Sequence, residues 1–444
     1  MSFLDFVKRL FFRPVGPARA PLTPPVAAAP CPQPPQPVAA APPSIGAMLR
    51  TEEMLDQQGR LAGYRFSLKT GQGQAPPPGA YLDALRAARV SSLAERRLAV
   101  MAIGLDEWLA EDFASLNARH TVWQIDMPDA SEALSPEWLA GLQRIRASGA
   151  GIALSCQPTV PGLDAALAMA THGFLDFTHA GIEGFERQVK RLRQAFPALI
   201  LAAENVATWS ERRLCIDRGT GLVMGSFLST VDENDQNGKL SESRLVLIEM
   251  LNLVREDGDA QAIAEVAKRD PGVTVQILSR ANSAAYGLGQ PLTGIDQAIM
   301  VLGRETLYRQ LAMSIFRAGE DSARNATLLE VALARARFLE LAALSVSSKQ
   351  QADELFLVGL LSFVDTLLGM PMKDIVATMS LPQIVQDVLL RSDGPYGRYL
   401  LLTLSVEKCL PERATKLAYT LGIELDDLSQ YRNAALQWAE EAVG

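Results

Sequence analysis

The hydrophobic periodicity of this 444-residue chain changes near residue 235, which predicts two different folds in series. Before that point, short apolar runs alternate with helical patterns, as expected for strands joined by crossover helices. The runs are residues 100–103, 121–125, 151–154, 174–177 and 199–203, and the helical stretches are residues 137–147, 162–171, 185–196 and 208–218. We therefore expect a parallel sheet, and about 185 residues are enough for a β/α barrel.

From Leu240 onward, one helical pattern follows another, and no segment shows a convincing period of two. The second half is therefore predicted to be an α-helical domain. The expected fold class is an α/β barrel over residues 46–232, followed by an all-α domain over residues 240–444. A polar stretch at residues 233–239 is the predicted hinge between them.

The first 45 residues have a composition that cannot form a core. Residues 14–45 hold twelve of the 26 prolines, mostly with alanine between them, which favours an extended linker. Residues 1–13 predict an amphipathic helix whose apolar face carries Phe3, Phe6, Val7, Leu10 and Phe11. A helix on such a tether suggests docking to a partner protein or to an anionic membrane surface. The alternative is a frayed terminus that folds back on its own domain.

Composition narrows the classes of function. A net charge of −8 argues against broad contact with a phosphate backbone, so no nucleic-acid partner is expected. The four cysteines lack metal-type spacing and predict free thiols in a reducing compartment. No apolar run reaches the roughly 18 residues of a membrane span, and the start does not read as a secretory signal. We expect a cytoplasmic protein, peripheral to the inner membrane if residues 1–13 bind lipid.

Spaced motifs in the second half point to a known family. Asp270 before Pro271 is an N-cap followed by proline at the first helical position, and Asn282, Tyr286 and Gly303 follow. This pattern resembles the HDOD domain, a non-catalytic relative of the HD metal-dependent phosphohydrolases. Most of these residues are expected to pack or to cap backbone, and Asp270 and Asn282 are the clearest capping candidates.

The resemblance continues through residues 355–370, which are similar to the helix that carries the His-Asp pair in HD enzymes but lack that pair. Ser362 and Phe363 stand at that position, and there is no histidine between Ala180 and Gly444. A His/Asp metal centre of the usual kind cannot be assembled there.

The first half resembles a decayed EAL domain, a barrel that hydrolyses cyclic di-GMP with divalent metal ions. The stretches 203–209 and 222–229 look like the family's AEGVET and QGYFFS segments. Glu204 matches the first glutamate of the AEGVET segment. Arg65 stands at the glutamate that names the family, and Gln124 at another glutamate. The remaining positions that the family uses fall at Ala102, Ser155, Cys156, Asp176, Thr178, Ala207 and Met224.

This set of replacements predicts that the barrel is not an enzyme. Hard cations such as Mg²⁺ need several oxygen ligands, and one carboxylate beside an arginine cannot hold them. No metal and no cofactor are expected. Glu204 is instead expected to pair with Arg65 or Lys69, and Lys69 and Glu204 are the residues to test for ligand binding.

The function that this reading favours is a non-catalytic adaptor in bacterial signal transduction, linked by resemblance to cyclic di-GMP circuits. Its partners would be signalling proteins such as a kinase, a regulator or a receiver, and the resemblance leaves a homodimer open. The main alternative is a receptor that binds cyclic di-GMP without hydrolysis, and residual phosphodiesterase activity is a distant third. His120, His172, His179 and Cys156 are expected to be structural.

Overall fold

The computed structural model describes residues 47–70, 76–128, 133–156, 160–179, 181–232, 240–283, 290–319 and 322–443. All of them belong to one compact unit, Pro42–Gly444. The predicted helix at residues 1–13 and the linker at residues 14–45 lie outside the described residues.

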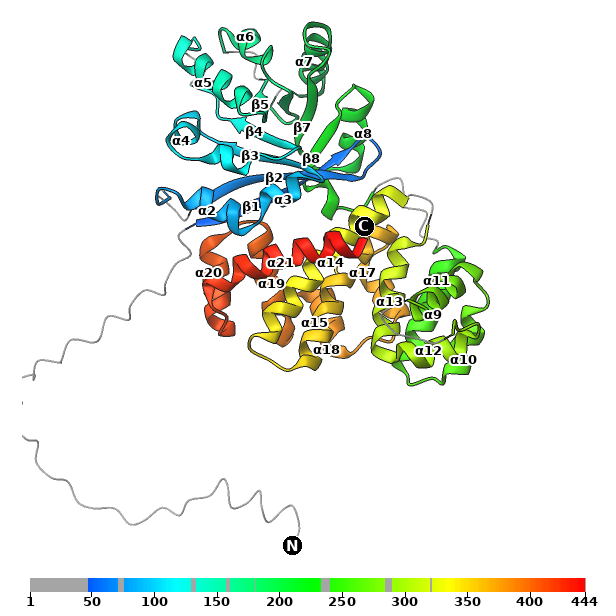
Figure 1. Ribbon diagram of the computed structural model, residues 1–444. Coiled ribbons are helices and arrows are strands. Elements are labelled where there is room, and N and C mark those ends of the chain that lie inside the picture. Colours follow the sequence, from blue (N-terminus) through cyan, green and yellow to red (C-terminus); the bar gives the residue numbers. More distant parts are fainter. Residues whose placement is uncertain are drawn as a thin grey trace, which may run out of the picture. The chain divides into compact units, whose positions relative to one another are not determined.

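The first domain is a closed eight-stranded barrel in which neighbouring strands follow the order of the sequence (Figure 1). The strands are β1 (Ala47–Asp56), β2 (Leu61–Thr70), β3 (Leu98–Ile103), β4 (Thr121–Ile125), β5 (Gly151–Ser155), β6 (His172–Asp176), β7 (Ile200–Val206) and β8 (Leu222–Gly225). The strands from β2 to β8 pair in parallel, whereas β1 is antiparallel to both β2 and β8.

The antiparallel β1 corrects the expectation of a purely parallel sheet. Asp56 ends β1 and its backbone N–H donates to the carbonyl of Arg60 over 2.9 Å, which closes a tight turn. Gly59 has φ 84° in this turn, a conformation that glycine adopts without strain. A connection this short cannot contain a crossover helix, so β1 and β2 must form a hairpin.

Short helices connect the other strands. They are α2 (Ala80–Ala87), α3 (Val90–Ala94), α4 (Leu105–Ala110), α5 (Pro136–Ala147), α6 (Leu163–Leu167), α7 (Gly181–Ala195) and α8 (Trp209–Asp217), with 3₁₀ turns η1 (Phe113–Leu116) and η2 (Ser226–Ser229). Ser135 caps α5 and Thr208 caps α8, the latter in a reciprocal capping box with Glu211. The predicted helices of the barrel are therefore present.

The second domain is all helical. Its elements are α9 (Glu242–Arg255), α10 (Ala260–Ala267), α11 (Pro271–Ala281), α12 (Ile295–Leu302), α13 (Arg304–Arg317), α14 (Ser322–Leu344), α15 (Lys349–Leu361), α16 (Val364–Leu368), α17 (Met372–Thr378), α18 (Gln383–Arg391), α19 (Gly394–Glu407), α20 (Pro411–Leu421) and α21 (Leu425–Val443). A closed barrel followed by a helical domain confirms the predicted fold class.

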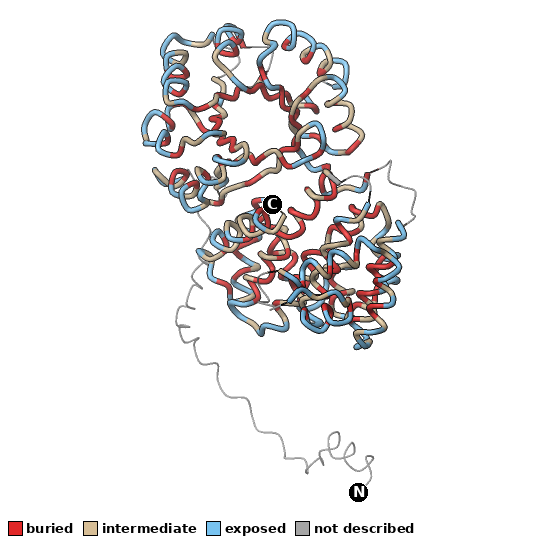
Figure 2. The backbone as a smooth tube through the Cα atoms, turned by 45° about the vertical axis from the view of Figure 1, so that its right-hand side comes forward, coloured by how far each residue is buried: buried red, intermediate tan, exposed pale blue. Residues whose placement is uncertain are grey.

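The barrel interior and the rest of the protein form separate cores. Buried stretches of backbone occur in both the barrel and the helical domain (Figure 2). The interior is filled by one apolar side chain or two from most strands, namely Met54, Val100, Val122, Ala153, Phe174, Ala202, Leu222 and Met224. The larger core continues from the outer barrel surface into the helical domain. Alternating side chains of each strand thus serve the two cores.

The outer face of the β1–β2 hairpin contacts the helical domain. Glu330 of α14 accepts two hydrogen bonds from Arg97, at 2.6 and 3.1 Å, and lies 3.4 Å from the Tyr64 hydroxyl. Thr327 of the same helix donates to the carbonyl of Gly59 over 2.9 Å. The barrel and the helical domain are therefore joined by buried polar contacts as well as by apolar packing.

No single described helix is long and apolar enough to cross a bilayer, although the bent pair Lys349–Leu368 and Met372–Thr378 passes a test of length and composition.

Candidate functional site

The mouth of the barrel is formed by the side chains that follow the apolar interior layer along each strand. Because strand side chains alternate, positions two residues beyond that layer face the same interior. At the carboxyl ends of β4, β5, β6 and β7, and at the matching part of β1, these positions are polar, whereas β3 has Ala102 there. The polar residues are Glu52, Gln124, Ser155, Asp176 and Glu204, and Arg65 of β2 is bonded to two of them.

Arg65 occupies this mouth between two carboxylates. Its Nη1 lies 2.6 Å from Glu204 Oε2, and its Nη2 lies 2.7 Å from Glu52 Oε2. The three side chains are only 15–19% exposed. Burial by itself would lower the pKa of Arg65, but the charges of Glu52 and Glu204 outweigh it and raise the pKa above its ordinary value. The expected pairing of Glu204 with Arg65 is present, and Glu52 completes it.

Lys69 is not part of this cluster. It lies on β2 four residues beyond Arg65, which is about 13 Å along a strand. Its side chain is exposed, and it faces Met48 across the hairpin. Lys69 also acts electrostatically on Cys409 of the helical domain. The two candidate ligand residues, Lys69 and Glu204, are therefore placed apart.

A third carboxylate of the mouth, that of Asp176, is satisfied by neutral groups. Asp176 accepts hydrogen bonds from the backbone and hydroxyl of Thr178, at 2.8 and 2.7 Å, and from Asn205 Nδ2 at 3.0 Å. Burial would raise the pKa of Asp176, but these bonds hold it below its usual value. Asn205 adopts φ 61° at the end of β7, which turns its amide toward Asp176.

The described residues contain no group of three or more His, Cys, Asp or Glu side chains placed to hold a metal ion. Cys156 is buried, and burial raises its pKa to about 12, so the thiol is protonated and unreactive at neutral pH. The Oε1 atom of Gln124 is buried and has no hydrogen-bond partner among the described residues. The mouth thus offers Arg65 as its central charge, with each nearby carboxylate already bonded.

The HDOD motif residues have structural roles wherever they are described. Asp270 Oδ1 accepts from the backbone of Gly272 and Val273, at 2.8 and 3.1 Å, which confirms it as the cap of α11 with Pro271 at the first position. Asn282 bonds to both backbone groups of Leu292, at 2.7 and 2.9 Å.

Gly303 separates α12 from α13 with φ 72°, a backbone conformation suited to glycine. Tyr286 lies outside the described residues.

An arginine also contacts Ser362 and Phe363, the two residues at the expected HD position. Arg335 of α14 bonds to Ser362 Oγ at 2.9 Å and to both oxygens of Glu407, at 2.9 and 2.7 Å. Its guanidinium carbon lies 4.0 Å from the centre of the Phe363 ring. Ser362 and Phe363 therefore hold a protein cation in place, which ties α14 to the end of α15 and to α19.

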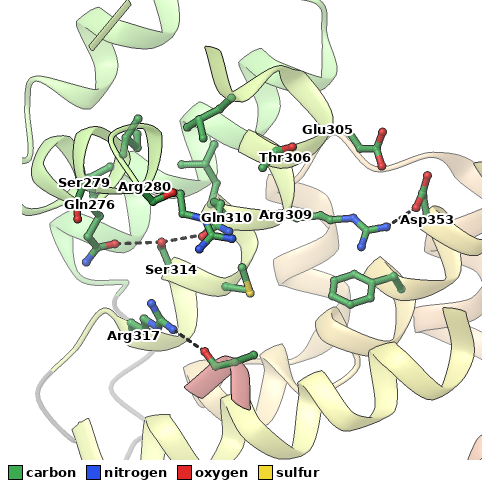
Figure 3. A pocket seen from close by; sticks show the side chains of 18 of the residues that line it. Gln276, Ser279, Arg280, Glu305, Thr306, Arg309, Gln310, Ser314, Arg317 and Asp353 are labelled. Atoms are coloured by element: carbon green, nitrogen blue, oxygen red, sulfur yellow. Dashed lines mark hydrogen bonds and ion pairs between the residues drawn. The ribbon is translucent and has the colours of Figure 1, made fainter. Parts of the chain in front are cut away.

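A groove of about 910 Å³ lies on the helical domain, between α11, α13, α15 and α21 (Figure 3). Its apolar wall includes Val275, Met313, Phe356 and Trp438. The Phe356 and Trp438 rings meet edge to face with centroids 5.9 Å apart. Polar side chains line the rest, so the groove has the mixed character of a site for a protein segment.

Several features of these sites were not predicted from the sequence. Glu52 was missed because its partner Arg65 is reached only across a hairpin, although their spacing around the turn could have suggested it. The Arg335–Glu407 pair joins residues 72 positions apart, for which a single sequence gives no signal. The groove is equally hidden, because its walls come from helices distant in sequence.

Comparisons with known proteins agree with part of the sequence reading. A family model of the HDOD domain matches residues 242–376, which confirms that resemblance. The chain is 30% identical over 250 residues to the uncharacterized protein YuxH of Bacillus subtilis, covering 54% of this chain and 58% of YuxH. It is 23% identical over 241 residues to the cyclic di-GMP phosphodiesterase CdgJ of Vibrio cholerae, covering 54% of this chain and 55% of CdgJ.

The chain spans about half the length of the curated relatives it matches. Among solved structures, the EAL domain of Xanthomonas citri FimX in complex with c-diGMP is 18% identical. That match covers 42% of this chain and 87% of the FimX domain, with a TM-score of 0.30.

Proposed function

We propose that this chain is a non-catalytic adaptor in cyclic di-GMP-linked signalling and that it acts through protein contacts. The observation that carries this proposal is the position of Arg65. A guanidinium that is bonded to Glu52 and Glu204 fills the mouth with positive charge, where a divalent metal ion would need free carboxylates.

Two further observations support the proposal. At the degenerate HD position, Arg335 is held by Ser362 and Glu407, so a second site of the same kind contains a protein cation. The groove of about 910 Å³ provides a concave surface large enough to receive a segment of another protein. The similarity to CdgJ, named as a cyclic di-GMP phosphodiesterase, supports the link to that signalling molecule.

The test is titration calorimetry of the full chain with cyclic di-GMP and Mg²⁺ or Mn²⁺, with the same samples assayed for linear product. We expect neither saturable heat nor product. Saturable binding without product would replace the adaptor with a receptor, and product that disappears in Glu204→Gln would replace it with an enzyme. Arg65→Glu is the companion variant, and it should also form no product because Gln124 and Ser155 still supply no carboxylate.

A further inference from the structure

The groove on the helical domain is uneven in charge, and this unevenness indicates what it binds. At one side Arg309 is neutralised by ion pairs with Glu340 and Asp353, and its guanidinium lies 4.4 Å from the centre of the Phe356 ring. Lys349 lies 4.0 Å from Glu305. These charges are compensated within the protein.

The other side carries two arginines that form no ion pair with a carboxylate of the described residues. The side chain of Arg280 in α11 is exposed and has no hydrogen bond or ion pair with any described residue. Arg317 of α13 is also exposed and reaches only the carbonyl of Ala442, at 3.4 Å. Glu441 also lines the groove, but it forms no ion pair within the described part of the chain.

The two arginines belong to one surface. Ser314 Oγ donates to Gln276 Oε1 over 3.1 Å, which joins α13 to α11 (Figure 3). Arg280 lies four residues after Gln276, and Arg317 three residues after Ser314, so each arginine is one helical turn from this bond. Apolar side chains line the same groove, and Val275 among them is 64% exposed.

The groove therefore offers an apolar wall and two arginines without an ion-pair partner in the described part of the chain. An amphipathic helix that carries carboxylates next to apolar side chains complements both features. The chain's own residues 1–13 match less well, because Lys8, Arg9 and Arg13 outnumber Asp5. A nucleic acid matches less well, because its phosphates would run along the whole groove, including the side where Arg309 and Lys349 are already neutralised.

We propose that this groove binds an acidic amphipathic helix of a partner protein, with apolar side chains on the wall formed by Val275, Met313 and Trp438 and carboxylates on Arg280 and Arg317. The inference rests on the proposed function, because it specifies the partner through which the adaptor acts. It does not depend on the state of the barrel mouth, so product formation there would overturn the adaptor and leave the groove to be judged separately.

The test uses three fluorescein-labelled synthetic helices of equal length with the same leucine positions and with glutamate, glutamine or lysine at every polar position. Fluorescence anisotropy with the full chain should rank their affinities glutamate, then glutamine, then lysine. Binding of the glutamate helix should also change the emission of Trp438, and Trp438→Phe should abolish that change. Raising the salt concentration should weaken the glutamate helix most.

The decisive variant is Arg280→Glu with Arg317→Glu, which should weaken the glutamate helix about tenfold and strengthen the lysine helix. Its matched control is Arg398→Glu with Arg413→Glu, which makes the same change in net charge at exposed positions of α19 and α20 outside the groove. Thermal unfolding of both double variants checks that the fold is kept. The control should leave the affinity for the glutamate helix within about twofold.

Four outcomes would overturn the proposal. They are equal affinity for the glutamate and lysine helices, an equal loss in the control variant, no binding by any helix, and tighter binding by a peptide of residues 1–13 than by the glutamate helix. A self-association that sedimentation detects in the wild type and that Arg280→Glu with Arg317→Glu abolishes would assign the groove to a second copy of the chain instead.

Discussion

At the residue scale, Arg65 is held by two carboxylates that would repel each other without it. Glu52 and Glu204 come from strands at opposite ends of the sequence of the barrel, and Arg65 bonds to both. Arg50 also bonds to Glu52, at 2.7 Å, but its side chain is 38% exposed. The same carboxylate thus has a buried partner and an exposed one, and the two should differ in their contribution to stability.

Replacing Arg65 with alanine is predicted to lower the free energy of unfolding by about 2 kcal/mol, because two largely buried carboxylates lose their cation. Arg50→Ala is the control and should cost less than about 0.5 kcal/mol. Urea denaturation at neutral pH measures both. The loss in Arg65→Ala should shrink as the pH falls through the range where carboxylates protonate, and a loss that is unchanged at low pH would contradict an electrostatic cause.

His172 predicts a second dependence on pH. Burial lowers its pKa from 6.5 to about 4, so the folded protein keeps the imidazole neutral while the unfolded chain binds a proton. Stability should therefore be lost as the pH falls from 6.5 toward 4, by up to about 3 kcal/mol from this group. The measurement is the difference in unfolding free energy between the wild type and His172→Gln across that range. A difference that does not change with pH would show that His172 does not titrate as described.

Individual residues show how far the sequence could be read. The pairing of Glu204 with Arg65 and the cap at Asp270 were predicted, because one follows from opposite charges in a buried place and the other from a local motif. The role of Arg335 was not predicted. Its partners Ser362 and Glu407 are brought together only by packing of three helices, and charge alone does not choose among many arginines.

At the element scale, the β1–β2 hairpin serves both domains at once. Consecutive side chains of a strand point to opposite faces, so Glu52 faces the mouth while Glu53 lines a cavity against the helical domain. On β2, Arg65 faces the mouth and Tyr64 faces Glu330. Periodicity predicted the five parallel strands from β3 to β7, but the direction of β1 depended on the short turn after Asp56, whose chemistry the sequence reading overlooked.

The contact between the two domains at this face can be tested at the ion pair of Glu330 with Arg97, the residue just before β3. The side chain of Glu330 is 4% exposed and that of Arg97 is 21% exposed. Removing the arginine therefore leaves a buried carboxyl group without its cation. Removing the carboxyl group leaves an arginine that still reaches solvent and Glu440. Arg97→Ala should therefore destabilise the protein more than Glu330→Gln, by about 1–2 kcal/mol.

Burial already raises the pKa of Glu330 despite its bonds to Arg97, and loss of Arg97 should raise it further. The deficit of Arg97→Ala should consequently be largest at neutral pH and decrease as the pH falls. Equal deficits for Arg97→Ala and Glu330→Gln, measured by urea denaturation, would contradict this account.

At the scale of the whole molecule, the barrel and the helical domain share a continuous core and buried polar contacts. We predict that calorimetry of the full chain shows one unfolding transition. Arg97→Ala combined with Thr327→Val should separate it into two, because both variants remove contacts between the domains and leave each interior unchanged. Two transitions in the wild type would show that the domains are thermodynamically independent.

Residues 1–43 give a further whole-molecule prediction. Their proline-rich composition cannot supply a core, so deleting them should leave the unfolding temperature of the chain unchanged while altering its location or its recovered partners. Scanning calorimetry of the shortened chain tests the first part, and imaging of a tagged form tests the second. A lowered unfolding temperature would mean that this segment packs on the folded body, and unchanged location and partners would remove it from the mechanism.

The ion pairs at the barrel mouth also constrain how this protein can evolve. A single step from Arg65 to glutamate places three acidic side chains, at positions 52, 65 and 204, in one enclosed space without a cation. Such an intermediate would lose folding stability, so natural selection would remove it. A lineage that carries this arginine can therefore acquire new contacts elsewhere far more easily than it can exchange the arginine for a carboxylate.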